Sequence, residues 1–551
     1  MTNRSRRAVF LTLTAAAMAG CRGAEAESGV ERTPEHRLRA VLSQTADSTV
    51  VVPLIAGDTL AVSAPTLEFY RRLRFRPAWT AGSDMERARV LHAALGRAEE
   101  DGLDPDSYGH DVATRLLATL DIEGDSALDD EARAGYVADL DVVLSEGYMR
   151  FVNDIVRGAI DPDSVGSAWR IPRNDAPGWH VLRSVVRGGD PVQIIERLRP
   201  GTPYYGRMMA ALARLRQVRE AGGWAKLAGD ANVAAGDSSA AIVALRERLA
   251  RSDDPRESQL ARRGAARPEV YDRDLRDALR HYQERHALDD DGALGSGTLR
   301  ELNHDVEERI AELKLNLDRW RWLPQDLGRL FVLVNIAGFE LEVVENDLAI
   351  ESMNVVVGQE GWHTPVFADT MEHVVVNPYW TPPESIMEQE IRPAMARDPG
   401  YLARNNFERT SDGRVRQRPG PGNALGRFKF LFPNDDNIYL HDTPANHLFS
   451  RARRDFSHGC IRVERPYDLA RLIVSKASTH SAASIEGMLA TRSEKWITLK
   501  KPIPVYIVYF TAWVKEDGTL RFHHDVYGHD EELESQQDEL EEGAERRVAA
   551  T

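Results

Sequence analysis

The sequence predicts a multidomain α+β protein, with a helical N-terminal half followed by a β-rich C-terminal domain. At 551 residues the chain is too long for one ordinary hydrophobic core. Apolar residues recur at helical spacing up to about residue 225, and from residue 329 they form short runs typical of strands. Hydrophobic residues make up 42% of the chain and charged residues 28%, as in soluble globular proteins. We therefore expect two or three domains.

The first 21 residues have the features of an export signal. Arg4, Arg6 and Arg7 precede an apolar stretch that ends at Met18, too short to span a bilayer as a helix. Met18-Ala19-Gly20-Cys21 also resembles a bacterial lipobox, whose Cys is lipidated; the alternative is an ordinary signal with a Cys there by chance. We predict a signal over residues 1–21 with a lipid on Cys21, then a polar tether over residues 22–60. The protein would then be a periplasmic lipoprotein, anchored to a membrane without spanning it.

A helical domain is predicted over residues 61–225. Its amphipathic segments begin near Leu67 and are interrupted by several prolines. None of them carries a recognisable catalytic group of residues. Gly222 to Ser239 is rich in Gly, Ala and Asp and is predicted to be a linker.

Residues 240–305 form a compact unit with three predicted helices, at Ile242–Leu249, Leu275–His286 and Thr298–Asn303. The pair Tyr282-Gln283, a turn of the Asp-Gly-x-x-Gly kind and a Thr-led helix resemble the peptidoglycan-binding helical module. Asp289-Asp290-Asp291 could suggest a calcium loop, but the run lacks the alternating ligands and terminal Glu of an EF-hand. We expect a turn and a helix cap there.

Residues 329–530 are predicted to be one β-dominated domain. Strand-like runs include Leu330–Ile336, Met353–Val357 and Val505–Trp513. Between strands, residues 382–427 form an insertion rich in Pro, Arg and Gly, where a lid would lie. Residues 531–551 are predicted to be an acidic, disordered tail. The net charge of −16 argues against nucleic acid as a partner.

Only two cysteines occur, Cys21 and Cys460. If Cys21 is lipidated, the mature protein has a single thiol and no internal disulfide. A lone thiol in an oxidising compartment is at risk of oxidation, so its retention suggests use, although a small buried core residue is the commoner fate.

The residues around Cys460 favour a catalytic thiol. A nucleophilic Cys needs a neighbour that takes or stabilises its proton, and His is the usual one. His458 lies two residues before Cys460, on the same face if the segment is a strand, and His441 could face it from a separate strand. Gly459 leaves room for an approaching substrate, and the N–H groups of Gly459 and Cys460 could hold an oxyanion.

His441 followed by Ser457-His458-Gly459-Cys460 resembles the signature of the L,D-transpeptidase family. Four further motifs resemble its large multidomain branch, which has a helical scaffold domain, a peptidoglycan-binding module and a capping insertion. They are Trp320-Arg321-Trp322-Leu323-Pro324, Thr364-Pro365-Val366-Phe367, Asn377-Pro378-Tyr379-Trp380 and Pro419-Gly420-Pro421-Gly422-Asn423-Ala424-Leu425-Gly426. The resemblance covers about residues 65–530 and implies a β-sandwich catalytic domain.

The resemblance implies a role for each site residue. Cys460 would be the nucleophile and His441 the general base and acid. Ser457, His458, Gly459 and Tyr439 would shape the substrate and oxyanion site. Arg462 would contact a peptide carboxylate, or else pair with a local acid such as Glu464.

The implied reaction is acyl transfer on peptidoglycan stem peptides, without metal or cofactor. His523, His524 and His529 could suggest a metal site, but a surface strand end is the preferred interpretation. A hydrolase of the same fold, such as an L,D-carboxypeptidase, and a non-catalytic scaffold that anchors the membrane to the wall are the alternatives. Glycan and wall-synthesis proteins are further expected partners. A thiol of lowered pKa would also make Cys460 a carbapenem target.

Overall fold

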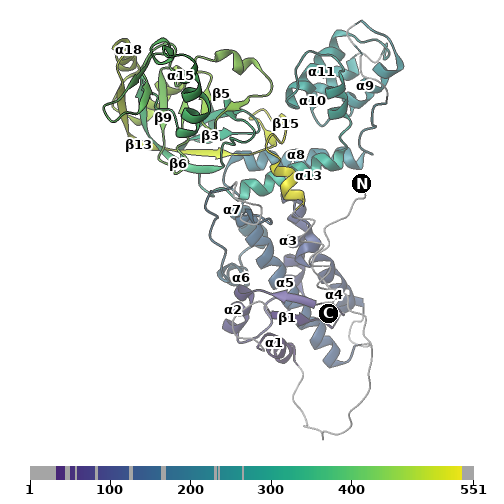
Figure 1. Cartoon of the computed structure of the whole chain (residues 1–551). Coiled ribbons are helices and arrows are strands. Elements are labelled where there is room, and N and C mark those ends of the chain that lie inside the picture. The colour runs from purple at the N-terminus through teal and green to yellow at the C-terminus, as the bar shows by residue number, and fades with distance from the viewer. Residues whose placement is uncertain are drawn as a thin grey trace.

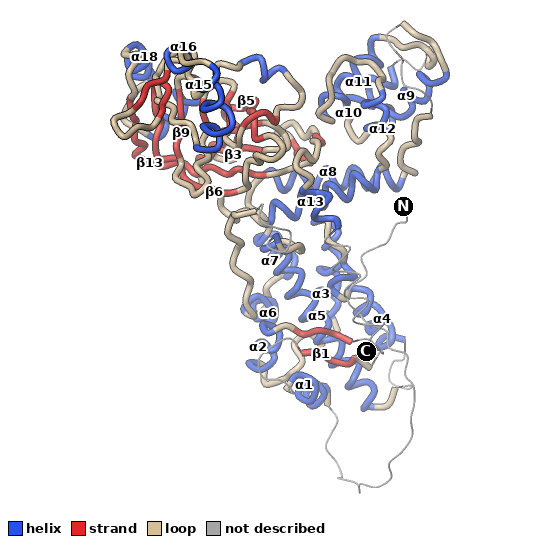
Figure 2. The backbone as a smooth tube through the Cα atoms, viewed as in Figure 1, coloured by secondary structure: helices blue, strands red, loops and turns tan. Residues whose placement is uncertain are grey.

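The computed structural model describes residues 33–43, 50–55, 57, 59–80, 85–122, 128–162, 169–228, 233, 236–263 and 266–535. Figure 1 shows the sheet domain and a small helical module at one end of the molecule and a helical domain at the other, with α8 and α13 between them. In Figure 2 most strands gather in the sheet domain. The predicted multidomain α+β architecture is confirmed.

The helical domain packs around one long central helix, α5 (Asp130–Arg157). Asp141 on α5 is fully buried and accepts hydrogen bonds from the backbone of Ala78, Trp79 and Thr80. These bonds satisfy a buried carboxylate and fix the start of the domain to its centre. The other helices are α2 (Ala64–Arg72), α3 (Glu86–Gly96), α4 (His110–Ile122), α6 (His180–Val186) and α7 (Pro191–Leu198), with the short helices η1 (Arg97–Asp101) and η2 (Pro105–Tyr108).

The tether expected for residues 22–60 is wrong where the structure describes that range. Helix α1 (Pro34–Leu42) and the hairpin of β1 (Val50–Pro53) and β2 (Thr59–Val62) pack onto the helical domain. Leu38 and Leu42 are fully buried because they lie on one face of α1, four residues apart. This segment therefore belongs to the folded domain, and residues 22–32 lie outside the described residues.

Helices α8 (Pro203–Glu220) and α13 (Val306–Arg321) pack against each other and join the core of the sheet domain. Helix α13 begins with a capping box between Asp305 and Glu308. Arg321 at its end contacts the carbonyl oxygen of Asp101 and donates to the hydroxyl of Tyr205 at 3.0 Å. The predicted boundary at residue 225 thus groups α8 with the helical domain, although the buried residues of α8 belong to the core of the sheet domain.

The described residues of the small module form four helices, α9 (Ala240–Ala250), α10 (Pro255–Arg263), α11 (Arg273–Arg285) and α12 (Ser296–Leu302), so α10 adds to the three predicted. The Asp-rich run is a turn, as expected. Gln283, 1% exposed, donates to Asp291 and to Thr298 and accepts from the N–H of Gly292. The aromatic-Gln pair therefore joins α11, the turn and α12.

The sheet domain is one nine-stranded sheet in the order β11-β5-β12-β10-β9-β6-β13-β3-β4, and an additional β5–β4 pairing closes it on itself. Its strands are β3 (Leu330–Asn335), β4 (Glu340–Glu345), β5 (Leu348–Gly358), β6 (Phe367–Val376), β9 (Phe428–Leu431), β10 (Leu440–His441), β11 (Asp455–Ser457), β12 (Ile461–Val463) and β13 (Lys495–Val508). Helices α17 (Pro466–Ala477) and α18 (Ala482–Ala490) pack on the sheet, the short helix η5 (Asn446–Ser450) precedes β11, and β14 (Ala512–Val514) pairs with β15 (Leu520–Phe522).

The predicted insertion folds as a small subdomain with its own core of Met387, Ile391, Phe407 and Val415. We call residues 382–427 the cap. It contains α14 (Glu384–Ile386), the π-helical turn η4 (Met387–Ile391), α15 (Arg392–Arg397), α16 (Tyr401–Arg404), β7 (Phe407–Arg409) and β8 (Val415–Gln417).

The prediction that residues 531–551 form a disordered tail is wrong for residues 531–535. Residues 529–535 are helical, and Leu533 is 4% exposed in a cluster with Ile160, Leu315 and Trp322. An apolar side chain among acidic residues anchors this helix. Residues 536–551 lie outside the described residues.

Candidate active site

One face of the sheet carries polar side chains where β9, β10 and β12 lie side by side. His441 on β10 lies opposite Lys429 of antiparallel β9 and opposite Arg462 of parallel β12. Alternate residues of a strand point to opposite faces. The core therefore receives Phe428, Phe430, Leu440 and Ile461, all fully buried, and the other face receives Lys429, His441 and Arg462. Tyr439 and Cys460 directly precede β10 and β12.

A cavity of about 1020 Å³ opens over this face. Cys460, Tyr439, Lys429 and His458 line it, together with Arg170 from the helical domain. The start of the cap contributes Pro382, Pro383, Ser385 and Ile386. The structure thus brings the predicted nucleophile, the predicted site residues Tyr439, His458 and Gly459, and the predicted lid to one cavity.

The thiol of Cys460 donates a weak hydrogen bond to the carbonyl oxygen of Asn437, with a sulfur–oxygen distance of 3.7 Å. Burial raises the pKa of Cys460 above that of an ordinary thiol. Hydrogen bonds from Tyr439 and the charges of Lys429 and Arg462 act in the opposite direction but do not offset burial. The expectation of a lowered thiol pKa is therefore wrong for the resting protein, whose thiol is neutral.

His441 is 6% exposed, and its Nδ1 lies 2.6 Å from the carbonyl oxygen of Asp442. A carbonyl only accepts hydrogen bonds, so Nδ1 carries the proton and Nε2 presents its lone pair. Burial, and then the charge of Arg462, lower the pKa of His441 to about 3. Among the described residues no hydrogen bond joins His441 to Cys460, although Cys460 directly precedes β12, the strand that pairs with β10.

Ser457 and Gly459 shape the loop that carries the thiol. Gly459 has a φ of +102°, a conformation that side chains rarely adopt, which explains the glycine. Ser457 Oγ accepts from the Gly459 N–H at 3.2 Å and donates to the Cys460 carbonyl at 2.6 Å. The Gly459 N–H predicted for the oxyanion is therefore already bonded. The Cys460 N–H has no acceptor among the described residues.

His458 lies on a bend and not on a strand, so the same-face relation to Cys460 does not apply. Its Nε2 lies 3.1 Å from Glu390 of the cap, and its ring meets Trp362 edge-on at 5.1 Å. His458 thus joins the thiol loop to the cap.

The side chain of Arg462 makes no hydrogen bond or ion pair with another described residue, whereas its backbone belongs to the sheet. Glu464, its predicted alternative partner, accepts from the N–H of Asn354 at 3.2 Å and pairs with Arg465. Burial lowers the pKa of Arg462, whereas the negative charge of Glu390, and that of Cys460 when it is a thiolate, would raise it. Its guanidinium is therefore free to meet an anionic group.

Lys429 is a site residue that the sequence analysis missed. Its Nζ lies 3.8 Å above the ring of Tyr439, and burial lowers its pKa. The available signal was the alternation Phe428-Lys429-Phe430, which places a lysine on the face opposite two core residues.

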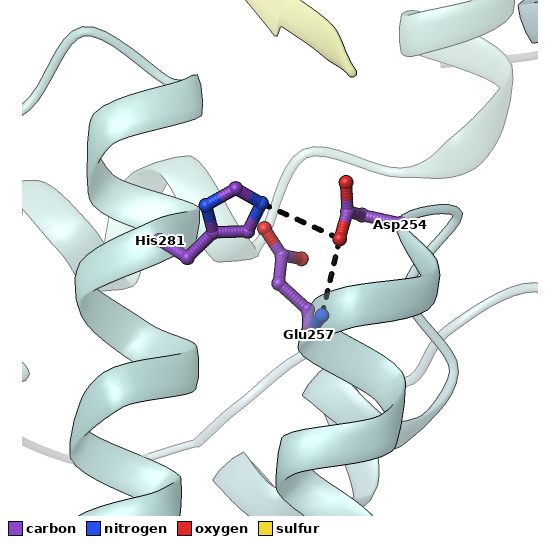
Figure 3. Close-up of side chains that lie close together, drawn as sticks. All are labelled: Asp254, Glu257 and His281. Atoms are coloured by element: carbon purple, nitrogen blue, oxygen red, sulfur yellow. Dashed lines mark hydrogen bonds and ion pairs between the residues drawn. The ribbon is translucent and has the colours of Figure 1, made fainter. Parts of the chain in front are cut away.

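A group of possible metal ligands lies in the module instead of the sheet domain. Asp254, Glu257 and His281 approach one another in Figure 3. Asp254 accepts from the N–H of Glu257 at the start of α10 and lies 3.4 Å from His281, while Glu257 binds Arg285 at 2.6 Å. Both carboxylates are thus engaged, and we interpret the group as a structural ion-pair network. His523 and His529 form no such group within the described residues.

Two family models match the chain. Residues 329–482 match the L,D-transpeptidase catalytic domain, and residues 64–212 match the Scaffold domain. The chain belongs to the L,D-transpeptidase family. Cys460 and His441 both lie within the matched catalytic segment, and α8 extends past the end of the matched scaffold segment.

A curated relative, a putative L,D-transpeptidase of Haemophilus influenzae, is 32% identical over 243 residues, which are 40% of this chain and 48% of the relative. The chain thus spans about half the length of that relative. The L,D-transpeptidase from Mycobacterium smegmatis is 14% identical and covers 33% of this chain and 58% of its own, with a TM-score of 0.18. An L,D-transpeptidase fragment from Xylanimonas cellulosilytica is 14% identical and covers 51% of this chain and 98% of its own, with a TM-score of 0.16.

The predicted lipidation site, Cys21, lies outside the described residues. Among the helices that the structure describes, none combines the length and the apolar character needed to cross a membrane.

Proposed function

We propose that this L,D-transpeptidase family member forms peptidoglycan cross-links through an acyl-enzyme on Cys460. The main support is the placement of Cys460 in a cavity, directly before β12, which pairs with the strand that carries a neutral, oriented His441. A neutral thiol needs a base at the moment of attack, and the free Nε2 of His441 can be that base.

In the first half-reaction Cys460 Sγ attacks the carbonyl carbon of the third, diamino-acid residue of a tetrapeptide stem. His441 Nε2 takes the thiol proton, and the negative carbonyl oxygen accepts a hydrogen bond from the Cys460 N–H. The C–N bond then breaks, His441 returns the proton to the departing nitrogen, and D-Ala leaves. The positive charges of Lys429 and Arg462 suit the carboxylates of the stem.

In the second half-reaction the amine of a neighbouring stem attacks the thioester carbon. His441 accepts a proton from this amine and delivers it to the sulfur, so that the thiol is restored as the amide forms. Water in place of the amine would give an L,D-carboxypeptidase.

The rest of the chain would bring this site to its substrate. We infer that the four-helix module binds peptidoglycan and that a lipid on Cys21 anchors the protein to a membrane, facing the wall in the periplasm. Wall-synthesis proteins would be its partners there.

The test is mass spectrometry of muropeptides after incubation with the full chain and with Cys460→Ala, with Cys21→Ala as the control for the second cysteine. New cross-linked dimers from the parent and Cys21→Ala, but none from Cys460→Ala, would support transpeptidation. Cys460-dependent tripeptides without dimers would indicate the hydrolase. No conversion by the parent would favour the non-catalytic anchor.

Carbapenem acylation belongs to the same proposal. A β-lactam is a strained amide, and its ring carbonyl needs the same thiol and base as a stem peptide. We expect a carbapenem to form a one-to-one thioester on Cys460 and to block cross-linking. Intact-protein mass spectrometry should show the adduct in the parent and not in Cys460→Ala.

A further inference from the structure

The peptide bond between Gly459 and Cys460 is held on its carbonyl side by Thr364. The Thr364 hydroxyl donates to the Gly459 carbonyl oxygen at 2.7 Å and accepts from the Gly358 N–H at 2.9 Å. Thr364 is 1% exposed, so water does not compete for these bonds. In a trans peptide the carbonyl and the following N–H point in opposite directions. Because Thr364 fixes the direction of the Gly459 carbonyl, the Cys460 N–H must point away from the Thr364 side chain.

The backbone groups on either side of the Cys460 N–H already have partners, since the Gly459 carbonyl binds Thr364 and the Ile461 N–H donates to the Tyr439 carbonyl. Ser457 Oγ binds the Gly459 N–H and the Cys460 carbonyl, at 3.2 and 2.6 Å. Among the described residues, this leaves the Cys460 N–H as the unpaired backbone donor beside the thiol. A donor of fixed direction and without a partner is what a developing oxyanion requires.

Thr364 is itself held by Tyr527. The Tyr527 hydroxyl accepts from the Thr364 N–H at 3.2 Å and donates to the Gly358 carbonyl at 2.6 Å. Its ring stacks on His363 with a centroid distance of 4.0 Å. Gly358 closes the arrangement tightly, because a Cβ there would lie 2.0 Å from the carbonyl oxygen of Trp362. Tyr527 lies outside the segment 329–482 that matches the catalytic domain.

We propose that Thr364 and Tyr527 are positioning residues that fix the Cys460 N–H as an oxyanion donor. Thr364 acts on the Gly459–Cys460 peptide directly, and Tyr527 acts through Thr364. The inference rests on acylation of Cys460, as in the proposed function. When the Sγ–carbon bond forms, the carbonyl π electrons move to oxygen, and the Cys460 N–H stabilises that charge until the leaving group departs.

Two reactions of the same thiol separate this role from a general effect on structure. Acetylation by 4-nitrophenyl acetate passes through a tetrahedral oxyanion, whereas alkylation by iodoacetamide is a displacement at carbon without one. Both rates are measured on the full chain, and the Cys460 peptide is quantified by mass spectrometry so that Cys21 does not contribute. Thr364→Val removes the hydroxyl, Thr364→Ser retains it, and Tyr527→Phe keeps the ring on His363.

Thr364→Val should lower the acetylation rate about 10- to 100-fold, toward the loss typical of one oxyanion donor, with alkylation nearly unchanged. Thr364→Ser should stay close to the parent, and Tyr527→Phe should show a smaller selective loss. An unchanged ratio of the two rates, or equal losses in both, would overturn the proposal.

If thermal unfolding shows that Thr364→Val does not fold, the ratio for Tyr527→Phe decides. Neither reagent is a peptidoglycan stem peptide, so the two rates can be measured whether or not the protein forms cross-links. A parent that reacts with both but forms no cross-links would contradict the proposed function and leave this inference standing.

Discussion

His441 donates its Nδ1–H to the carbonyl oxygen of Asp442, the next residue in the chain, at 2.6 Å. A backbone carbonyl thus orients the imidazole, where many catalytic histidines use a carboxylate. The Asp442 carboxylate has another task, since it accepts from the N–H groups of Arg427 and Thr443 at 2.7 Å each. The main chain of Asp442 orients His441, while its side chain fixes the last residue of the cap.

Replacement of His441 should remove most of the activity. Gln has a similar size but cannot take a proton, so His441→Gln should lower the cross-linking rate about 10²- to 10⁴-fold. His458→Gln is the matched control and should have a smaller effect, because His458 pairs with Glu390 of the cap. The measurement is the initial rate of muropeptide dimer formation. Equal losses in the two variants would contradict the assignment of His441 as the base.

Lys429 should control the ionisation of the thiol. Its charge favours the thiolate of Cys460, and its removal should raise the thiol pKa further. The rate of iodoacetamide alkylation against pH should have its midpoint above that of a small free thiol in the parent, and higher still in Lys429→Gln. Lys429→Arg keeps the charge and should resemble the parent. A midpoint below that of the free thiol would contradict the neutral resting state.

Much of the fold was predictable because the spacing at which hydrophobic residues recur along the sequence indicates the type of secondary structure. The helical half, the strands from residue 329 and the cap all follow from it. Helix α1 escaped prediction although Thr33 caps it and Pro34 begins it, because only Leu38 and Leu42 form its short buried face. Leu533 is a similar case, since one apolar residue in an acidic segment gives no periodic signal.

The site was predictable only where chemistry and spacing coincide. Cys460 and His441 are rare residue types in a recognisable arrangement. Thr364 and Tyr527 are 163 residues apart, and only the fold brings their hydrogen bond together. The raised pKa of Cys460 is also a consequence of burial, which a motif does not reveal.

The lipid anchor can be tested independently of the chemistry. Cys21→Ala should release the protein from the membrane fraction, because the lipid would be attached to that thiol. Cell fractionation of the parent and the variant measures this, and Cys460→Ala, which should remain in the membrane fraction, is the control. Membrane retention of Cys21→Ala, or a mature chain that begins at Met1, would refute the lipoprotein prediction.

Gly426, near the end of the cap, packs against Asp442, the residue that follows His441. A methyl group at this position should therefore disturb both the cap and the segment that carries His441. The φ of Gly426 is +57°, and a Cβ would lie 2.2 Å from Asp442 Cγ. Gly426→Ala should therefore combine the backbone cost of a left-handed residue, about 1 to 2 kcal/mol, with an overpacking cost of about 1 to 3 kcal/mol.

Gly413 in the cap isolates the first contribution, because its φ is +86° and a Cβ at this position would meet no described atom within 4 Å. Gly413→Ala should thus cost only about 1 to 2 kcal/mol. Urea unfolding of both variants measures the difference. Because the displaced residue is Asp442, whose carbonyl orients His441, Gly426→Ala should also slow acetylation of Cys460, whereas Gly413→Ala should not. Equal destabilisation by the two variants would show that Asp442 moves aside without a cost in free energy of unfolding. An unchanged acetylation rate in Gly426→Ala would show that the movement of Asp442 does not affect His441.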